Sequence, residues 1–327
     1  MKLAAFSAAA LAALLSPPAA SAPGRPSLGL PLACELGRSC EIQHYVDRDP
    51  GPGVKDYRCG TMTYDTHNGI DIRVPDMAAQ RRGVAVVAAA AGRVDRLRDG
   101  VADVSIRDPG AVSVVNAECG NGVVVDHGDG WETQYCHMAK GSIGVKKDDV
   151  IAAGTPLGRV GLSGNTEFPH LHFTVRHNGQ AVDPFAPDSA PACGARASLW
   201  RPDVQAKVAY RAGAVLNAGF TEVQLGMADL EAGRLAPVTA ASPLLVAYAR
   251  GIALLPGDVV EIELKGPDGA VLAKSRGQPL LRWRAQDLVY VGKRRPATGW
   301  PRGSYVAEYR VWRAGTPAIR RRFSLAL

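Results

Sequence analysis

The chain has 327 residues, a net charge of +7 at pH 7 and 46% hydrophobic residues, so it can bury a sizeable core and accommodate two domains. It contains no Gly-rich phosphate loop and no dinucleotide fingerprint, which leaves no motif for nucleotide chemistry.

The first residues have the features of a secretory signal peptide. Met1 and Lys2 precede an apolar run from Leu3 to Leu15, and a small-residue cleavage site ends at Ala22. The run is too short to span a bilayer, and no later stretch approaches about 20 apolar residues. We predict that residues 1–22 are a signal peptide cleaved near Ala22, and that the protein is exported, periplasmic or secreted, with no transmembrane anchor. An N-terminal membrane anchor is the alternative. Export argues against nucleic acid as a partner.

All six cysteines follow the signal peptide. An even number in an oxidising compartment indicates disulfides, although six cysteines permit several connectivities. A zinc site made of cysteines is the alternative, but no Cys-x-x-Cys spacing exists. A nucleophilic Cys136 is disfavoured because His137, next to it in a strand, would point to the opposite face. We favour three pairs: Cys34–Cys40 as a local loop, Cys119–Cys136 across a hairpin, and the remaining Cys59–Cys193.

Short β-segments are predicted through the first half of the chain, at Val84 to Ala88, Val123 to His127, Glu132 to His137 and Leu171 to Arg176. The motif from His67 to Asp71 contains the turn signal Asn68-Gly69, so we expect a loop that runs into a strand starting at Ile70.

Histidine is concentrated in three short motifs of this half. They are His67-Asn68-Gly69-Ile70-Asp71, Tyr135-Cys136-His137-Met138 and Pro169-His170-Leu171-His172-Phe173. Side chains two apart in a strand share a face, with Cα atoms roughly 7 Å apart, so His170 and His172 point into the same space. A catalytic zinc usually takes three protein ligands from His, Asp, Glu or Cys and leaves a position open. The motifs predict a zinc site, but spacing cannot decide between His170 and His172 as the ligand.

In these motifs the chain resembles the lysostaphin-type, or LytM-like, zinc metalloendopeptidases, which cut peptide cross-links of bacterial cell walls as DD- or glycyl-endopeptidases. The resemblance runs from about His67 to Pro184. It includes a segment from Gly120 to Met138 that looks like the family's central hairpin, and a segment from Gly154 to Phe173 that looks like its final strand pair.

The resemblance implies that His67, Asp71 and His172 bind one Zn²⁺, while His137 and His170 stay off the metal as catalytic histidines. Zinc can lower the pKa of bound water to about 7 and polarise the scissile carbonyl. The two other imidazoles would then transfer protons and stabilise the oxyanion. His127 is expected to be structural, and His44 and His177 to be surface residues.

The chain departs from the family pattern at a few positions. Phe168 stands where glycine is usual, Thr174 stands where glutamate is common, and the segment between Asp95 and Cys119 is longer than in the family. We expect these differences at the rim of the substrate groove.

The pattern changes in the second half, where short alternating strands are separated by Gly- and Pro-containing turns. The strands are predicted at Leu244 to Ala249, Val259 to Lys265, Gly269 to Lys274, Leu288 to Val291, Tyr305 to Trp312 and Arg321 to Leu325. The fold expected is mainly β: an antiparallel LytM-like catalytic domain with an N-terminal extension at 23–188, a linker at 189–198, and a β-sandwich at 199–327, for which an Ig-like arrangement is one candidate. The sandwich has no histidine. Its final stretch is rich in cations, which either are solvated beside core aromatic residues or attract an anionic envelope polymer.

The function expected is therefore that of an exported zinc metalloendopeptidase acting on peptidoglycan cross-links. Two alternatives stay open. One is a non-catalytic LytM-like regulator of cell-wall amidases, although such regulators typically lack the ligands that this chain keeps. The other is an endopeptidase acting on secreted proteins.

Overall fold

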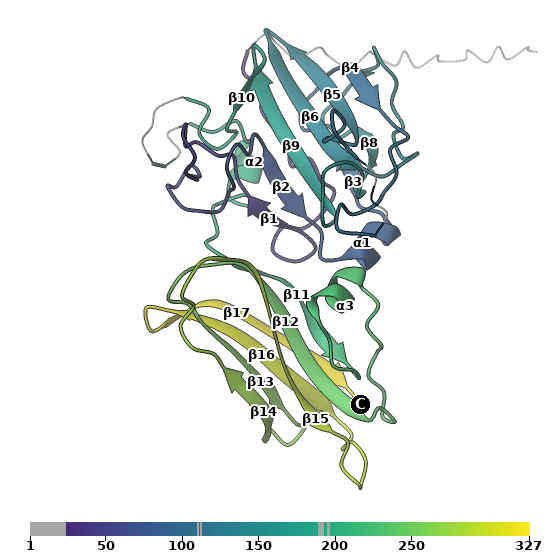
Figure 1. The fold of residues 1–327 in the computed structure, drawn as a ribbon, viewed down its shortest axis with the longest axis vertical. Helices are drawn as coiled ribbons and strands as arrows, with labels where there is room; N and C mark the ends of the chain where they lie inside the picture. The colour runs from purple at the N-terminus through teal and green to yellow at the C-terminus, as the bar shows by residue number, and fades with distance from the viewer. Residues whose placement is uncertain (1–23, 110, 112, 189–192, 195–196) are drawn as a thin grey trace, which may run out of the picture.

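The computed structural model describes residues 24–109, 111, 113–188, 193–194 and 197–327. The predicted signal peptide lies outside the described residues, as does most of the predicted linker. Within these ranges no helix is long and apolar enough to cross a membrane. The described chain is mainly β-structure, and the strands of every sheet pair antiparallel, as predicted (Figure 1).

An antiparallel sheet of eight strands carries the first half of the chain. Its order is β1-β2-β9-β6-β5-β4-β7, and β10 pairs with β9 off this path. Because β9 lies between β2 and β6, the sheet places segments about a hundred residues apart in direct contact. The strands are β1 (Glu41–His44), β2 (Ile70–Arg73), β4 (Gly92–Arg98), β5 (Asn121–Gly128), β6 (Trp131–Met138), β7 (Val150–Ile151), β9 (His170–His177) and β10 (Gln180–Val182).

Shorter elements surround this sheet. Strands β3 (Ala85–Val87) and β8 (Pro156–Arg159) form a separate pair. Helix α1 (Met77–Arg82) follows β2 and begins at Asp76, whose carboxylate accepts the Ala79 N–H at 2.8 Å, a normal N-cap bond. Helix α2 (Pro202–Gln205) packs its Val204 into the core of the large sheet.

Alternation along the central strands separates the core from the functional face. The core residues include Ile70, Ile72, Val123, Val125, Leu171, Phe173 and Val175, all at most 1% exposed. Since these occupy every second position, the residues between them, including Asp71 and His172, lie on the opposite face of the sheet.

All three predicted disulfides are present: Cys34–Cys40, Cys59–Cys193 and Cys119–Cys136. The second ties the segment before His67 to residues that follow the large sheet. The third joins the start of β5 to β6, beside the cleft described below.

Two further sheets form the C-terminal half. One has the order β11-β12-β15 and the other β14-β13-β16-β17. They share one hydrophobic core, with Leu245 and Ala247 from the first sheet and Ile262, Leu264 and Tyr309 from the second, so they form a β-sandwich. In the constant-type Ig fold the fourth strand lies beside the fifth, whereas here β14 pairs with β13. The elements are β11 (Ala214–Thr221), α3 (Met227–Ala232), β12 (Leu244–Leu254), β13 (Val259–Lys265), β14 (Val271–Arg276), β15 (Arg284–Arg294), β16 (Ser304–Arg313) and β17 (Thr316–Ala326).

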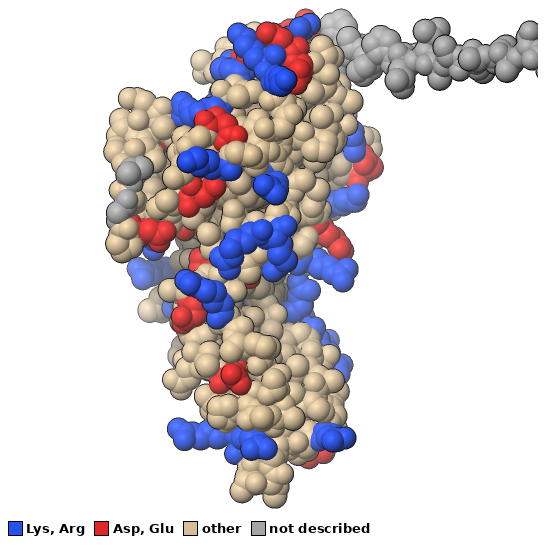
Figure 2. All heavy atoms as spheres, turned by 90° about the vertical axis from the view of Figure 1, so that its right-hand side faces the viewer, with Lys and Arg blue, Asp and Glu red and all other residues tan. Residues whose placement is uncertain are grey.

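Several cations of this half pair with acidic side chains. Arg313 binds the buried Asp258 at 2.8 Å, Arg310 binds Glu261 at 2.8 Å, and Arg276 binds Glu261 at 2.9 Å. On the face shown in Figure 2, the lower part, formed by the C-terminal sheets, carries few cations.

Candidate metal and catalytic site

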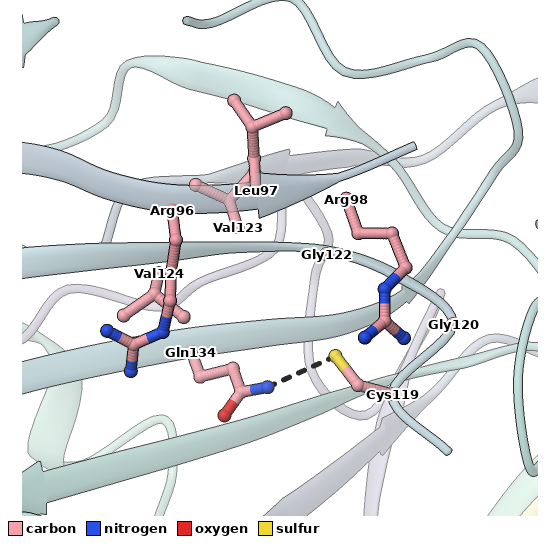
Figure 3. Close-up of a pocket in the computed structure, with 9 residues that line it drawn as sticks. All are labelled: Arg96, Leu97, Arg98, Cys119, Gly120, Gly122, Val123, Val124 and Gln134. Carbon is pink, nitrogen blue, oxygen red and sulfur yellow. Dashed lines mark hydrogen bonds between the residues drawn. The ribbon is translucent and has the colours of Figure 1, made fainter. Parts of the chain in front are cut away.

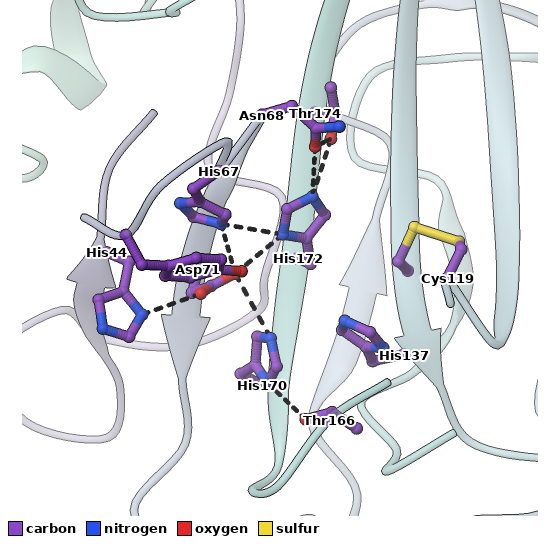
Figure 4. A network of polar contacts seen from close by, with 12 residues as sticks. His44, His67, Asn68, Asp71, Cys119, His137, Thr166, His170, His172 and Thr174 are labelled. Carbon is purple, nitrogen blue, oxygen red and sulfur yellow. Dashed lines mark hydrogen bonds and ion pairs between the residues drawn. A yellow bond between two sulfur atoms is a disulfide. The ribbon is translucent and has the colours of Figure 1, made fainter. Parts of the chain in front are cut away.

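The register of four strands brings the site together on the face opposite the core. His44 pairs with Asp71 across β1 and β2, Asp71 with His172 across β2 and β9, and His172 with Cys136 across β9 and β6. Residues paired directly across an antiparallel sheet point to the same face. One row of side chains therefore runs across the sheet, and His67 reaches it from the loop before β2 (Figure 4).

Three possible ligand atoms converge at the centre of this row. His67 Nε2 lies 3.2 Å from Asp71 Oδ1, His172 Nδ1 lies 2.9 Å from the same oxygen, and the two nitrogens are 3.2 Å apart. His67, Asp71 and His172 form a group in which one ligand atom from each lies within 4.8 Å of the others. The spacing suits a small cation bound between them.

The outer nitrogens of the two histidines identify the tautomers. His67 Nδ1 is 2.6 Å from the carbonyl of Tyr45, and a carbonyl can only accept, so this nitrogen carries the proton. His172 Nε2 is 3.1 Å from Asn68 Oδ1 and 3.0 Å from Thr174 Oγ1. A proton on His172 Nε2 satisfies both neighbours. In each neutral ring the other nitrogen then points a lone pair at the centre, as metal-binding histidines do.

Asp71 is held from its other side by His44. The Nδ1 atom of His44 lies 3.0 Å from Asp71 Oδ2, while Oδ1 faces the centre. His44 is only 8% exposed, so the expectation of a surface histidine is wrong. It is buried because β1 pairs with β2, which sets His44 opposite Asp71. The lone histidine of a short strand gave no sequence signal for this contact.

His170 lies beside the three converging atoms. Its Nε2 is 3.4 Å from Asp71 Oδ1, and its Nδ1 is 2.9 Å from the carbonyl of Phe168. Donation to that carbonyl leaves a lone pair on Nε2, directed toward the centre. His170 and His172 thus point into the same space, as predicted from their spacing.

His137 reaches the site through an unusual backbone conformation. Its φ is +61°, a left-handed value that costs of order 1–3 kcal/mol for a non-glycine residue and clusters at functional sites. The His137 N–H donates to the carbonyl of Cys119 at 2.8 Å, and Nδ1 bonds the carbonyl of Ser163 at 2.8 Å. This turn brings His137 into the cleft that Cys136 also lines, which corrects the expectation of opposite faces.

Burial and charge act together on the pKa values of the cluster. Burial opposes the charge of Asp71, but His67 and His170 outweigh it and hold the pKa of Asp71 well below its usual range. Burial lowers the pKa of His172 despite Asp71, and burial with two histidine neighbours lowers the pKa of His137 strongly. Burial opposes the charge of His67, but Asp71 outweighs it and raises the pKa of His67. One carboxylate with two imidazoles is a fitting donor set for Zn²⁺.

His67, His137 and His172 line a cleft of about 320 Å³. Its lining includes Tyr64, whose ring stacks on His67 with centroids 4.3 Å apart, and Arg176. A second depression of about 170 Å³ lies farther along the same face, flanked by Arg96 and Arg98 (Figure 3). The two share Cys119 and Gln134 in their linings, so they adjoin at the start of β5 and in β6.

Two departures from the family pattern contact the site rather than the rim. Thr174 Oγ1 bonds His172 Nε2, and the Phe168 ring lies 4.9 Å from the ring of His170. His127 instead bonds the carbonyl of Ala91 and the hydroxyl of Thr133, both at 2.8 Å. These contacts agree with its expected structural role.

Comparison with known proteins finds a family model that matches the region of this site. Residues 65–184 match the model of peptidase family M23, and this stretch contains all five predicted site residues. The chain is 33% identical over 122 residues to the DD-carboxypeptidase/endopeptidase Mpg of Neisseria meningitidis, covering 37% of this chain and 23% of that protein. It is 41% identical over 71 residues to the cell division protein DipM of Caulobacter vibrioides, covering 20% of this chain and 11% of that protein.

The chain thus spans less than a quarter of the length of these relatives. Among solved structures, a catalytic-domain variant of the prophage-encoded M23 protein EnpA from Enterococcus faecalis is 25% identical to it. That likeness covers 51% of this chain and 97% of that one, with a TM-score of 0.32.

Proposed function

We propose, from the premise that residues 65–184 form a peptidase family M23 domain, that the protein is an exported zinc metalloendopeptidase that hydrolyses peptide cross-links of bacterial peptidoglycan. The observation that carries the proposal is the convergence of His67 Nε2, Asp71 Oδ1 and His172 Nδ1. The names of relatives such as Mpg, a DD-carboxypeptidase/endopeptidase, support the substrate class.

The roles proposed for the side chains follow from the hydrogen bonds that they make on the side away from the converging ligand atoms. His67, Asp71 and His172 would hold Zn²⁺, which supplies a Lewis acid and a water of lowered pKa when bound. His170 and His137 each donate Nδ1–H to a backbone carbonyl, so each has a lone pair on Nε2 to accept a proton. Fixed acceptors on both rings keep the two proton carriers oriented, because neither ring can flip without losing its bond.

The rest of the chain has a supporting place in this proposal. Residues 23–188 would form the catalytic domain and residues 199–327 an accessory sandwich. Attraction of the sandwich to an anionic polymer stays a prediction without a supporting contact, since Arg310, Arg313 and Arg276 already bind carboxylates.

The test is digestion of purified peptidoglycan, with the released muropeptides identified by mass spectrometry. We expect new peptide termini from the zinc-loaded wild type, and none after chelation or in His172→Ala. His177→Ala is the matched control, because His177 stacks on Trp131 outside the cluster and should leave cleavage unchanged.

A zinc-loaded wild type that leaves every cross-link intact would refute the proposal. Activation of a wall amidase by such a protein would favour the regulator alternative. Cleavage of a secreted protein, with peptidoglycan untouched, would favour the protein-directed alternative.

A further inference from the structure

A buried ion cluster joins the large sheet to the C-terminal sandwich. Arg73 at the end of β2 and Arg250 on β12 both have fully buried side chains, and Glu231 on α3 lies between them. Glu231 Oε2 accepts from Arg73 Nη2 and, at 2.5 Å, from Arg250 Nη1. Breaking a buried pair by removing one partner is strongly destabilising, because the remaining charge stays buried. This cluster therefore fixes α3 against the end of β2.

Neutral acceptors also bind the two arginines, from both sides of the cluster. Arg73 Nη1 donates to Gln43 Oε1 at 2.9 Å, and Arg250 Nη2 donates to the carbonyl of Pro75. Gln286 on β15 accepts from both arginines at 3.4 Å. Arg73 is thus held by groups from the large sheet and from the sandwich together, so the position of its guanidinium depends on both.

Arg73 leads directly to the candidate catalytic histidine. It pairs with His170 across β2 and β9, on the same face as Asp71. Its Cζ lies 4.0 Å from the centroid of the Phe168 ring, a close cation–π contact. Phe168 in turn packs its ring against His170 and accepts the His170 Nδ1–H on its carbonyl. Thr166 Oγ1 donates to the same carbonyl at 2.9 Å.

We propose that the sandwich positions His170 through this chain of contacts, which we call the Glu231 clasp: Glu231 to Arg73, Arg73 to the Phe168 ring, and Phe168 to His170. Glu231, Arg73 and Phe168 are positioning residues, since none of them touches the converging ligand atoms. The inference rests on the proposed function, in which His170 moves a proton. It gives the C-terminal sandwich a part in the reaction.

If the Glu231 cluster only joined the large sheet to the sandwich, a different result would be expected. Its loss would lower the melting temperature and leave the ring of His170 as it was. The clasp predicts a change at His170 Nδ1–H, because the contact between Arg73 and the Phe168 ring fixes the residue whose carbonyl accepts this proton.

The experiment compares Glu231→Gln with Arg81→Met in the full chain. Glu231→Gln keeps the size of the side chain and removes its charge. Arg81→Met removes a second contact at the same junction, the bond from Arg81 Nη2 to the carbonyl of Ala232 at 3.0 Å, and the cation over the Phe168 ring is Arg73 rather than Arg81. The first readout is the His170 Nδ1–H signal in NMR spectra of the zinc-free protein. The second is kcat and KM for a cross-linked muropeptide with zinc bound.

We expect Glu231→Gln to shift or broaden the His170 signal and to lower kcat about tenfold with little change in KM, less than the roughly 100-fold that a 1 Å misplacement can cause. Arg81→Met should change neither readout. Phe168→Leu should lower kcat similarly, and the double variant should be no slower than Phe168→Leu alone, because both changes act through the same histidine.

The possible failures are distinguishable. A wild type without peptidase activity refutes the proposed function alone, and the His170 signal then decides the clasp. If Glu231→Gln does not fold, Phe168→Leu, which leaves the ion cluster intact, takes its place in both readouts. A His170 signal and a kcat that match those of Arg81→Met overturn the inference.

Discussion

Replacing His44 tests whether the buried contact behind Asp71 sets the affinity for zinc. His44→Ala removes the Nδ1 donor that lies 3.0 Å from Asp71 Oδ2. The Asp71 side chain is only 3% exposed, so solvent has little access to replace this bond. A hydrogen bond to a charged group is worth about 1.5–3 kcal/mol, and outer partners of metal ligands typically change affinity about 10- to 100-fold. We therefore expect His44→Ala to bind Zn²⁺ about 10- to 100-fold more weakly.

The assay is competition with a chromophoric zinc chelator at fixed pH, with thermal melting of the zinc-free protein as the folding control. His44→Asn keeps an N–H near the place of Nδ1 and should recover most of the affinity. His177→Ala removes a histidine outside the cluster and should have no effect. If folded His44→Ala binds zinc as tightly as the wild type, the reasoning is refuted. If His44→Asn binds zinc as weakly as His44→Ala, the hydrogen-bond donor to Asp71 does not set the affinity.

Two further predictions concern stability and rate. Burial raises the pKa of Glu41 to about 7, although the charge of Arg211 opposes this shift. Ionising Glu41 therefore costs more in the folded state than in the unfolded state, where the pKa is near 4.5. The resulting loss of stability begins near pH 4.5 and is complete above pH 7. Glu41→Gln should therefore be more stable than the wild type by about 3 kcal/mol at pH 8 and equal to it below pH 4, as measured by urea unfolding; equal stability at both pH values would contradict this. Replacing Cys119 and Cys136 by alanine should lower kcat about tenfold while zinc binding persists, because the Cys119 carbonyl accepts from the strained backbone of His137. Zinc titration and rate measurements on one sample check this. An unchanged rate would count against it.

Much of the fold follows from alternation in the sequence. The predicted strand from Val259 to Lys265 has the bounds that β13 has in the structure, because its inward residues are apolar and its turns are clear. Other strands are longer than predicted. Strand β15 extends from Arg284 to Arg294, where both ends are polar, because it pairs with β12 along its length. The pairing of β15 with the long strand β12 is a tertiary effect, which the alternation of residues within β15 cannot predict.

One strand and one backbone turn were not predictable for related reasons. Strand β11 contains Asn217 and Gly219, which are rare in strands, and it forms because β12 offers a partner edge. The period of two places His137 on the face away from Cys136, but the left-handed φ of His137 breaks that period at one residue. Both features depend on residues distant in the sequence.

The candidate ligands were recognisable because each motif carries its own chemistry, while the atoms that would bind depend on the fold. Asp71 and His172 lie directly opposite each other in neighbouring strands, where Cβ atoms are about 4.5–5.5 Å apart. The nitrogen nearer the backbone, His172 Nδ1, is therefore the one that meets Asp71 Oδ1. His67 comes from a loop and uses its near nitrogen on the Tyr45 carbonyl, which leaves the far Nε2 to reach the same centre. The distance from Asp71 to His172 thus follows from the sheet register, and the distance from Asp71 to His67 follows from the loop. Both distances end at the carboxylate of Asp71, which His44 holds from its other side, so His44 contributes to both.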